Sequence, residues 1–289
     1  MIERLCVIGV GLIGGSIAQA AREKGLCRSI IGVDSNRQNL QQAKTLEVID
    51  QGTADIEEGA RGADFIVVAT PVGVAEAVFS ALRPCWSDEA VYTDVGSTKR
   101  SVVAAVRAGF GFVPDNFVPA HPIAGAECSG VGASRSHLYR GKRVIVTPLS
   151  QTDRTVLAKV TAFWRGLGAE VSTMEAAHHD EVLAATSHLP HVVAYALVDM
   201  LGKKDEKREI FQFAAGGFGD FTRIASSDPR MWLDICLANR DEIVPLIKQL
   251  SVELEAIADM IGNDAADELL ETFRCANSAR QRFLNHVGS

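Results

Sequence analysis

Two short polar segments carry side chains suited to proton transfer. Residues 94–99 read Asp-Val-Gly-Ser-Thr-Lys, and residues 121–125 read His-Pro-Ile-Ala-Gly. Each follows an apolar, β-branched run, so each is expected at the carboxyl end of a strand, where open α/β sheets bind ligands. Pro122 should hold His121 in an extended backbone and end its strand there. An imidazole titrates near neutral pH, so His121 is either a general base or a structural histidine of the sheet rim.

A third polar segment, residues 187–191, reads Ser-His-Leu-Pro-His within a helical pattern. Ser187 and His191 are four positions apart, so they share one face of the helix. Pro190 is expected to bend the helix locally, because it lacks an amide hydrogen. By itself, His191 is compatible with a ligand pocket or with a helix surface or interface.

A fourth polar segment, residues 219–223, reads Gly-Asp-Phe-Thr-Arg and follows glycines that predict a turn over residues 216–219. Asp220 is a plausible N-cap for the next helix. Asp220 and Arg223 are three positions apart, which suits a local ion pair on a solvated face. The same pair could hold a guanidinium in place to bind a carboxylate with two hydrogen bonds.

A glycine motif lies near the N-terminus. Residues 9–14, Gly-Val-Gly-Leu-Ile-Gly, match G-x-G-x-x-G, follow an apolar strand pattern and open a helical one. In that context Gly9 permits a tight turn, Gly11 lets a pyrophosphate approach the backbone, and Gly14 lets helix and strand pack closely. The helix N-terminus, including Leu12 and Ile13, would offer amide groups and partial positive charge to the phosphates. A dinucleotide site is therefore predicted.

The cofactor choice depends on the end of the second predicted strand. Asp34 comes 20 residues after Gly14, where a carboxylate can accept hydrogen bonds from the adenosine ribose. That charge would repel a 2′-phosphate, so NAD is favoured over NADP. Arg37 could still turn toward a 2′-phosphate, so NADP is less favoured but possible. Thr70, at the end of another predicted strand, is expected to line the same site.

These polar segments need a scaffold, and the first half of the chain supplies an alternating β/α pattern typical of a doubly wound sheet. A last helix–strand pass over residues 154–167 and 170–174 closes this part. The predicted strands before that pass are residues 5–9, 30–34, 65–70, 91–94, 117–121 and 144–148, and the predicted helices are 13–24, 74–82 and 99–107.

From residue 175 onward, long segments with helical periodicity replace the strands, over residues 175–201, 231–261 and 265–283. Asp228 and Pro229 form a typical helix start, and Pro245 should kink or divide the helix that contains it. We therefore predict an α/β, Rossmann-type doubly wound domain over residues 1–174 and an all-helical domain over residues 175–289. The helical half has more apolar surface than one layer can bury, which suggests a homodimer interface.

Composition excludes several classes. The 29 basic and 36 acidic residues give a net charge of −7 with no basic block, so nucleic-acid binding has little support. No apolar stretch approaches the roughly 20 residues that span a bilayer, and no signal-peptide pattern opens the chain. The six cysteines are scattered without metal-finger spacing. We expect a soluble cytoplasmic protein without a metal site or membrane partner. The adjacent His178 and His179 point to different sides of a helix, so they cannot easily bind one metal ion, and we interpret them as the start of that helix.

In this order, the motifs G-x-G-x-x-G, D-V-G-S-T-K, H-P-I-A-G-x-E, S-H-L-P-H and G-D-F-T-R resemble those of the prephenate/arogenate (cyclohexadienyl) dehydrogenase family, from residue 1 to about 285. The resemblance implies an NAD-dependent oxidative decarboxylation in tyrosine biosynthesis: hydride leaves the ring carbon bearing the hydroxyl, and carbon dioxide leaves the opposite carbon. The chain has no room for a fused chorismate mutase or regulatory domain, which some members carry.

The resemblance also implies residue roles. His121 corresponds to the base that accepts the proton of the ring hydroxyl, and Ser97 to its hydrogen-bond partner near the nicotinamide. The pair His179-Asp180 also recurs in the family. The substrate-binding residues implied are Arg223, Asp220, Ser187, His191 and Glu127. A carboxylate at Glu127 would attract the ammonium group of arogenate, which predicts use of both substrates, unless Glu127 only caps its loop or pairs with Arg135.

Two other functions remain open from the sequence. A β-hydroxyacid dehydrogenase shares the plan of a Rossmann domain and a helical domain, but such enzymes use a lysine on the interdomain helix. This chain has no lysine between Lys159 and Lys203. A non-catalytic NAD-sensing module should lack polar residues at the sheet rim, yet His121, Ser97 and Arg223 are present.

Overall fold

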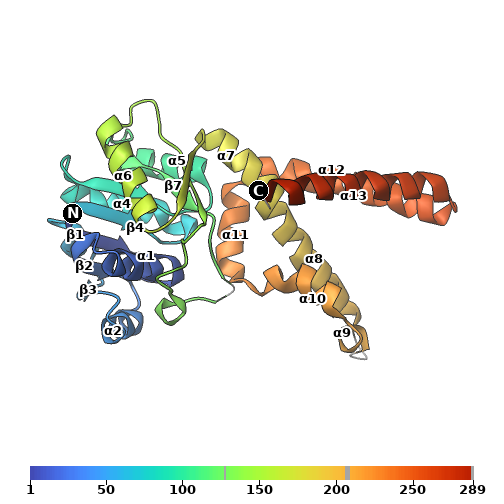
Figure 1. Ribbon diagram of the computed structural model, residues 1–289, viewed down its shortest axis with the longest axis horizontal. Helices are drawn as coiled ribbons and strands as arrows, with labels where there is room; N and C mark the ends of the chain where they lie inside the picture. Colours follow the sequence, from blue (N-terminus) through green and yellow to red (C-terminus); the bar gives the residue numbers. More distant parts are fainter. Residues whose placement is uncertain (127, 206–208, 288–289) are drawn as a thin grey trace. The chain divides into compact units, whose positions relative to one another are not determined.

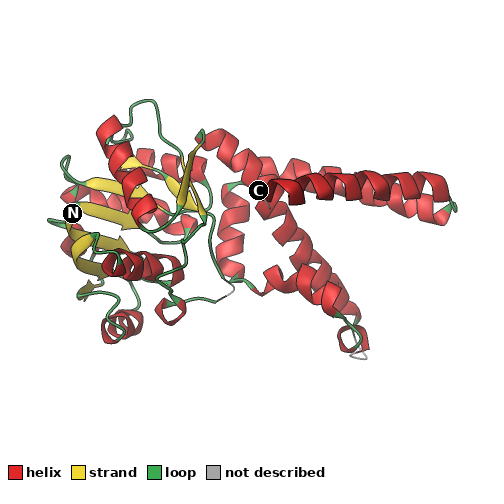
Figure 2. Ribbon diagram, viewed as in Figure 1, coloured by secondary structure: helices red, strands yellow, loops and turns green. Residues whose placement is uncertain are grey.

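The computed structural model describes residues 1–126, 128–205 and 209–287. By internal contacts the chain divides into two compact units, Met1–Arg240 and Asp241–Ser289, which are described separately (Figures 1 and 2). The domain boundary predicted near residue 174 therefore stays a prediction. Among the described residues, no helix has the length and apolar character needed to cross a membrane.

A six-stranded parallel sheet organises the first unit. Its strand order is β3-β2-β1-β4-β5-β6, with the chain reversing its direction of winding between β1 and β4. This is the doubly wound order of dinucleotide-binding folds, which confirms the predicted class. The strands are β1 (Ile2–Ile8), β2 (Cys27–Val33), β3 (Gln51–Thr53), β4 (Phe65–Val68), β5 (Val91–Asp94) and β6 (Phe117–Val118).

Both faces of this sheet are buried under helices, and alternate side chains of β1 belong to the two cores. Leu5 and Val7 pack with α1 and α6 in one core, and Cys6 and Ile8 pack with α4 and α5 in the other. Figure 1 shows these helices against the sheet. The helices of this part are α1 (Leu12–Glu23), α2 (Arg37–Thr45), α3 (Ile56–Ala60), α4 (Ala75–Leu82), α5 (Lys99–Phe110) and α6 (Arg154–Gly166).

The single strand predicted over residues 117–121 is wrong. The chain leaves the large sheet after Val118, and beyond Pro119 it enters a second sheet of β7 (Ala120–Pro122), β8 (Arg143–Val146) and β9 (Glu170–Thr173). There β7 runs antiparallel to β8, with His121 opposite Ile145. His121 therefore lies in the middle of a short strand of the second sheet, not at the end of a parallel strand.

Helices follow the second sheet within the first unit. Asp228 caps α11 by accepting hydrogen bonds from the backbone amides of Arg230 and Met231, which confirms the predicted helix start. Just before Pro190, where a bend was predicted, the chain makes a π-helical turn, η4, closed by a bond from the Leu189 amide to the Ala184 carbonyl. The elements are α7 (Ala176–Leu183), η4 (Ala184–His188), α8 (Leu189–Lys204), α9 (Glu209–Gln212), α10 (Gly216–Thr222), η5 (Arg223–Ser226) and α11 (Pro229–Ala238).

Two local predictions in the helical half are wrong. The glycines of residues 216–219 form the start of α10 rather than a turn, and Ala215 is the N-cap, so Asp220 lies inside the helix. Of the kink or division predicted at Pro245, the division is wrong, because α12 (Arg240–Gly262) is continuous through Pro245. The interruption comes earlier, at Asn239. In the second unit, α12 is followed by α13 (Ala266–Val287).

Candidate active site

The glycine motif forms the turn between β1 and α1. Gly9 has φ +94°, and a Cβ on it would lie 2.5 Å from the carbonyl oxygen of Ala69. A Cβ on Gly14 would lie 2.0 Å from the carbonyl oxygen of Gly9, so only glycine lets α1 start this close to the strand. In contrast, a Cβ on Gly11 would meet no atom within 4 Å. Two glycines are thus required by the fold, and the third leaves open space beside the backbone.

The open side of this turn has the donors that a dinucleotide phosphate needs. Gly11 is the N-cap of α1, and no side chain caps the helix there. The amide groups of the first turn, at Leu12 and Ile13, therefore stand at a helix N-terminus that favours anions. The hydroxyl of Tyr139 donates to the carbonyl of Ile13 at 2.7 Å and holds this turn from the other side.

Asp34 immediately follows β2 and is fixed by three donors. Its Oδ2 accepts from the Val10 amide at 3.1 Å and from Nδ2 of Asn39 at 2.8 Å, and its Oδ1 accepts from the Asn36 amide at 2.8 Å. A carboxylate has about four acceptor positions, so capacity remains for a ribose hydroxyl. Asn39 also donates to the Val10 carbonyl at 2.8 Å, which ties the carboxylate to the glycine turn.

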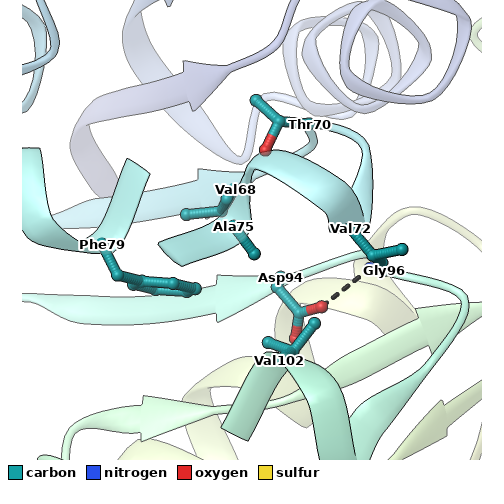
Figure 3. A pocket seen from close by; sticks show the side chains of 8 residues that line it. All are labelled: Val68, Thr70, Val72, Ala75, Phe79, Asp94, Gly96 and Val102. Atoms are coloured by element: carbon teal, nitrogen blue, oxygen red, sulfur yellow. Dashed lines mark hydrogen bonds between the residues drawn. The ribbon is translucent and has the colours of Figure 1, made fainter. Parts of the chain in front are cut away.

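Thr70 lies just beyond β4 and carries a buried hydroxyl with no hydrogen-bond partner among the described residues. It lines a small cavity with Val72, Asp94 and Gly96, seen in Figure 3. A buried hydroxyl without a partner is costly unless a ligand or water satisfies it. Together with the open glycine turn and the fixed Asp34, this atom makes the rim of the large sheet fit a dinucleotide.

A second polar cluster surrounds His121. Its Nδ1 lies 2.9 Å from Nε2 of His179, and Nδ1 of His179 lies 2.8 Å from Oδ1 of Asp180. Asp180 also accepts the backbone amides of Lys99 at 2.7 Å and Arg100 at 2.9 Å, at the first turn of α5. The cluster therefore joins β7, α5 and α7 through buried and part-buried hydrogen bonds.

Lys99 and Asp94 form a buried ion pair beside this cluster. The Lys99 ammonium binds Oδ2 of Asp94 and the carbonyl of Ala120, and its side chain has no exposed surface. Asp94 also accepts the amides of Gly96 at 2.7 Å and Ala120 at 3.1 Å. This pairing leaves Lys99 with a structural role at the start of β7, and it does not present a cation to a substrate.

The cluster favours uncharged imidazoles. Burial lowers the pKa of His121 well below its ordinary value, and the nearby His179 and Lys99 lower it further. Burial likewise lowers the pKa of His179, although the bond to Asp180 opposes the shift. Burial alone would raise the pKa of Asp180, but hydrogen bonds from His179 and from the Lys99 and Arg100 amides hold it below its usual value. At neutral pH, Asp180 is therefore charged and both histidines are neutral.

The predicted substrate residues lie in three different environments. His191 stacks on Trp232 with ring centroids 3.6 Å apart, and its Nδ1 donates to the Ser187 carbonyl at 2.9 Å. Ser97 is half-buried in the loop between β5 and α5, while Asp220 and Arg223 are exposed on α10 and η5. The remaining predicted residue, Glu127, lies outside the described residues.

The sequence pattern did not single out several residues that complete the site. His179 and Asp180 were interpreted as a helix start, although their recurrence in the resembled family was a usable signal. Asn39, which fixes Asp34, and Trp232, which stacks on His191, left no sequence signal. Within the described ranges, no group of three or more His, Cys, Asp or Glu side chains is placed to hold a metal ion.

Comparisons with known proteins cover nearly the whole chain. Two family models match: prephenate dehydrogenase, nucleotide-binding domain, over residues 17–173, and prephenate dehydrogenase, dimerization domain, over residues 175–275. A cyclohexadienyl dehydrogenase from Zymomonas mobilis is 34% identical over 283 residues, 97% of this chain and 96% of that protein. A prephenate dehydrogenase from Bacillus subtilis is also 34% identical, over 97% of this chain and 76% of that protein.

Solved structures agree with the sequence relatives. A prephenate dehydrogenase from Aquifex aeolicus, in complex with hydroxyphenyl propionate and NAD⁺, superposes with a TM-score of 0.89 at 36% identity. That comparison covers 98% of this chain and 99% of the other. An arogenate dehydrogenase from Synechocystis superposes with a TM-score of 0.79 at 25% identity, over 97% of this chain and 100% of the other.

Proposed function

The chain belongs to the prephenate dehydrogenase family, and on that premise we propose its reaction and the residues that perform it. It is an NAD-dependent oxidoreductase of tyrosine biosynthesis that converts prephenate to 4-hydroxyphenylpyruvate and carbon dioxide. The observation that supports this most directly is the neutral, half-buried His121 in the same compact unit as an open glycine turn. The arrangement pairs a proton acceptor with a dinucleotide site.

His121 is the general base. As hydride leaves the carbinol carbon, positive charge develops there, and loss of the hydroxyl proton lets the oxygen stabilise that charge. The lowered pKa keeps His121 unprotonated at neutral pH and ready to accept this proton. Its Nδ1 is held by His179, so Nε2 is the nitrogen that can face the substrate. Ser97, half-buried in the loop after β5, would contact the same hydroxyl.

NAD fits the residues of the glycine turn. The first turn of α1 would hold the pyrophosphate, and Asp34 would accept hydrogen bonds from the adenosine ribose hydroxyls. The buried hydroxyl of Thr70, which has no partner among the described residues, would hydrogen-bond to the cofactor. When bound, the nicotinamide ring accepts the hydride. The carboxylate of Asp34 would repel a 2′-phosphate, so NADP is the poorer cofactor.

The substrate carboxylates would bind residues of the helical segment. Arg223 is the proposed main anchor with Asp220 beside it, and Ser187 and His191 would line the pocket. Arg223→Ala should therefore raise KM for prephenate roughly 10- to 100-fold, because a hydrogen bond to a charged group contributes about 1.5–3 kcal/mol. Steady-state kinetics at saturating NAD would measure this. An unchanged KM would assign the anchor to another residue.

The assembly is a homodimer through the helical part, in line with the dimerization model that matches residues 175–275. Leu233 and Leu237 on α11 are 48% and 56% exposed in a single chain, and a partner would cover such side chains. All six cysteines are free thiols, which suits a reducing compartment. We propose the cytoplasm as the location.

The test of the proposed function is a substrate panel. Purified protein is incubated with NAD and either prephenate, arogenate or a 3-hydroxy acid, while NADH absorbance and released carbon dioxide are measured. We expect equimolar NADH and carbon dioxide with prephenate, and a second, lower rate with arogenate. Turnover of the 3-hydroxy acid alone would indicate a β-hydroxyacid dehydrogenase. Binding of NAD without turnover of any substrate would indicate a sensor.

A further inference from the structure

A chain of three hydrogen-bonded side chains runs behind the proposed base. His121 on β7 bonds to His179, and His179 bonds to Asp180, both on α7. The side chains of His179 and Asp180 have no exposed surface. The two imidazoles meet edge to face, with ring centroids 5.1 Å apart and an interplanar angle of 62°. The chain ends at a single carboxylate, so its proton positions can be worked out from that end.

Asp180 sets the first proton position. Its carboxylate accepts the amides of Lys99 and Arg100, and its pKa lies below the usual value, so it is ionised and can only accept. Nδ1 of His179 must therefore carry a proton and donate it to Oδ1 of Asp180. In neutral His179 the other nitrogen, Nε2, then carries no proton and can only accept a hydrogen bond. His121 must supply the hydrogen between the two rings from its own Nδ1.

The same logic fixes the reactive atom. A neutral His121 with its proton on Nδ1 has a lone pair on Nε2, and this is the nitrogen that its bond to His179 leaves available. We propose that His179 and Asp180 are positioning residues that hold His121 in this tautomer and stabilise the imidazolium it becomes. The inference rests on the proposed function for the identity of the proton that His121 accepts.

Neighbouring charges support a specific role for Asp180. The ionisable groups that face the chain are Lys99 and Arg100 of α5, Asp94 of β5 and His188 of η4. Asp94 and Lys99 neutralise one another in their buried pair. Arg100 lies 3.5 Å from Oδ2 of Asp180 and is 41% exposed, so solvent screens it. Asp180 is the carboxylate in direct line with His121, and its charge favours the protonated base.

Asp180 also has a purely structural contact, because it accepts two amides at the start of α5. The experiment must separate that contact from the proposed role. The first measurement is the pH profile of kcat/KM for prephenate with Asp180→Asn. We expect kcat to fall roughly 100-fold, since loss of the fixed tautomer weakens the base. The acid limb of this profile, where activity falls as His121 becomes protonated, should also move to lower pH. The reason is that the negative charge of Asp180, which favours protonated His121, is gone.

The variant His178→Gln is the matched control. His178 precedes His179 on α7, is exposed and contacts only Glu181 among the described interactions, so its replacement should leave kcat and the acid limb unchanged. Asp180→Glu, which keeps the charge, should recover part of the lost activity and return the limb toward its original pH. A fall in kcat with an unmoved acid limb in Asp180→Asn would overturn the proposal and leave Asp180 as a cap of α5.

A second measurement does not depend on activity. In ¹⁵N-histidine-labelled protein, with the His121 signals assigned from His121→Asn, the nitrogen shifts should report a proton on Nδ1 and a lone pair on Nε2 of His121. In His179→Phe this preference should be lost. A proton on Nε2 of His121 in the wild type would overturn the proposed positioning of His121 by His179 and Asp180. If wild-type protein fails to oxidise prephenate, the proposed function fails, while these shifts still decide the inference.

Discussion

The glycine turn after β1 and the polar cluster around His121 are both built from backbone amides and carboxylates, but over different sequence distances. The bonds that fix Asp34 join residues 2, 5 and 24 positions apart. In the cluster, His121 and His179 are 58 positions apart, and Lys99 and Asp180 are 81 apart. The bonds that fix Asp34 are thus made within the consecutive elements β1, α1, β2 and α2, whereas the cluster exists only after the second sheet and α7 have packed.

This difference has a thermodynamic consequence. Contacts made within one β/α/β unit require little chain closure beyond the fold of that unit. The cluster buries Asp180 and Lys99, and buried charges are tolerated only while all their partners are in place. We therefore expect substitutions on the open side of the turn, at Gly11 and Asp34, to act on cofactor binding, and substitutions in the cluster to act on catalysis.

The largest effect is expected from the centre of the cluster. His121→Asn removes the base but keeps a polar side chain that can bond to His179. We expect kcat to fall by about 100-fold or more, within the range for general base catalysis. Because the glycine turn is untouched, Kd for NAD, measured by fluorescence titration, should change little. If Kd rises as much as kcat falls, the two regions are not separable and the comparison fails.

The same contrast explains what the sequence could predict. The tight turn at Gly9, the close packing at Gly14 and the place of Asp34 at the end of the second strand were identified correctly, because they follow from contiguous strand and helix patterns. The role of Asp34 as a ribose acceptor stays a prediction. The division of strand 117–121 at Pro119 was missed, since a short apolar run does not reveal which of two sheets it joins. His179 and Asp180 were missed as partners of His121 because only tertiary packing brings them together.

Two glycine substitutions in the same turn separate the fold requirement from the ligand requirement. Gly14→Ala places a Cβ 2.0 Å from a carbonyl oxygen, whereas Gly11→Ala enters open space. Forced overpacking typically costs about 1–3 kcal/mol, so Gly14→Ala should lower Tm by several degrees, roughly 2–4 °C per kcal/mol at this size. Gly11→Ala should keep Tm and raise Kd for NAD. Thermal unfolding without ligand, followed by NAD titration, checks both, and equal Tm losses would contradict the assignment.

Asp34→Ser should have a smaller and more selective effect. The substitution removes a ribose acceptor and a charge that repels a 2′-phosphate. We expect kcat/KM with NAD to fall about tenfold, roughly one lost hydrogen bond to a charged group, and the ratio of NADP to NAD use to rise. Asn39→Ala is the companion variant, because it releases Asp34 but keeps the charge. A rise in relative NADP use with Asn39→Ala as well would show that position, not charge, sets the preference.

The smallest effect concerns stability and pH, and it distinguishes the two regions because residues 9–14 contain no ionisable side chain. Burial lowers the pKa of His188 to about 4. Nδ1 of His188 accepts a hydrogen bond from the side-chain Nδ2 of Asn239 at 3.1 Å. An unfolded histidine titrates near 6.5, so between these values protons bind the unfolded chain preferentially. The stability contributed by neutral His188 is complete above about pH 6.5 and is lost as pH falls toward 4, by at most about 1.4 kcal/mol per pH unit.

Urea unfolding at several pH values in this window measures that slope. His188→Gln keeps an acceptor for Asn239 but does not titrate, so its slope should be shallower than that of the wild type. The slope should not vanish, because burial also lowers the pKa of His121, His179 and His191. The exposed His178→Gln should match the wild type. Equal slopes in wild type and His188→Gln would mean that His188 is not buried as a neutral group, and the acid sensitivity would then belong to the other histidines with lowered pKa values, His121, His179 and His191.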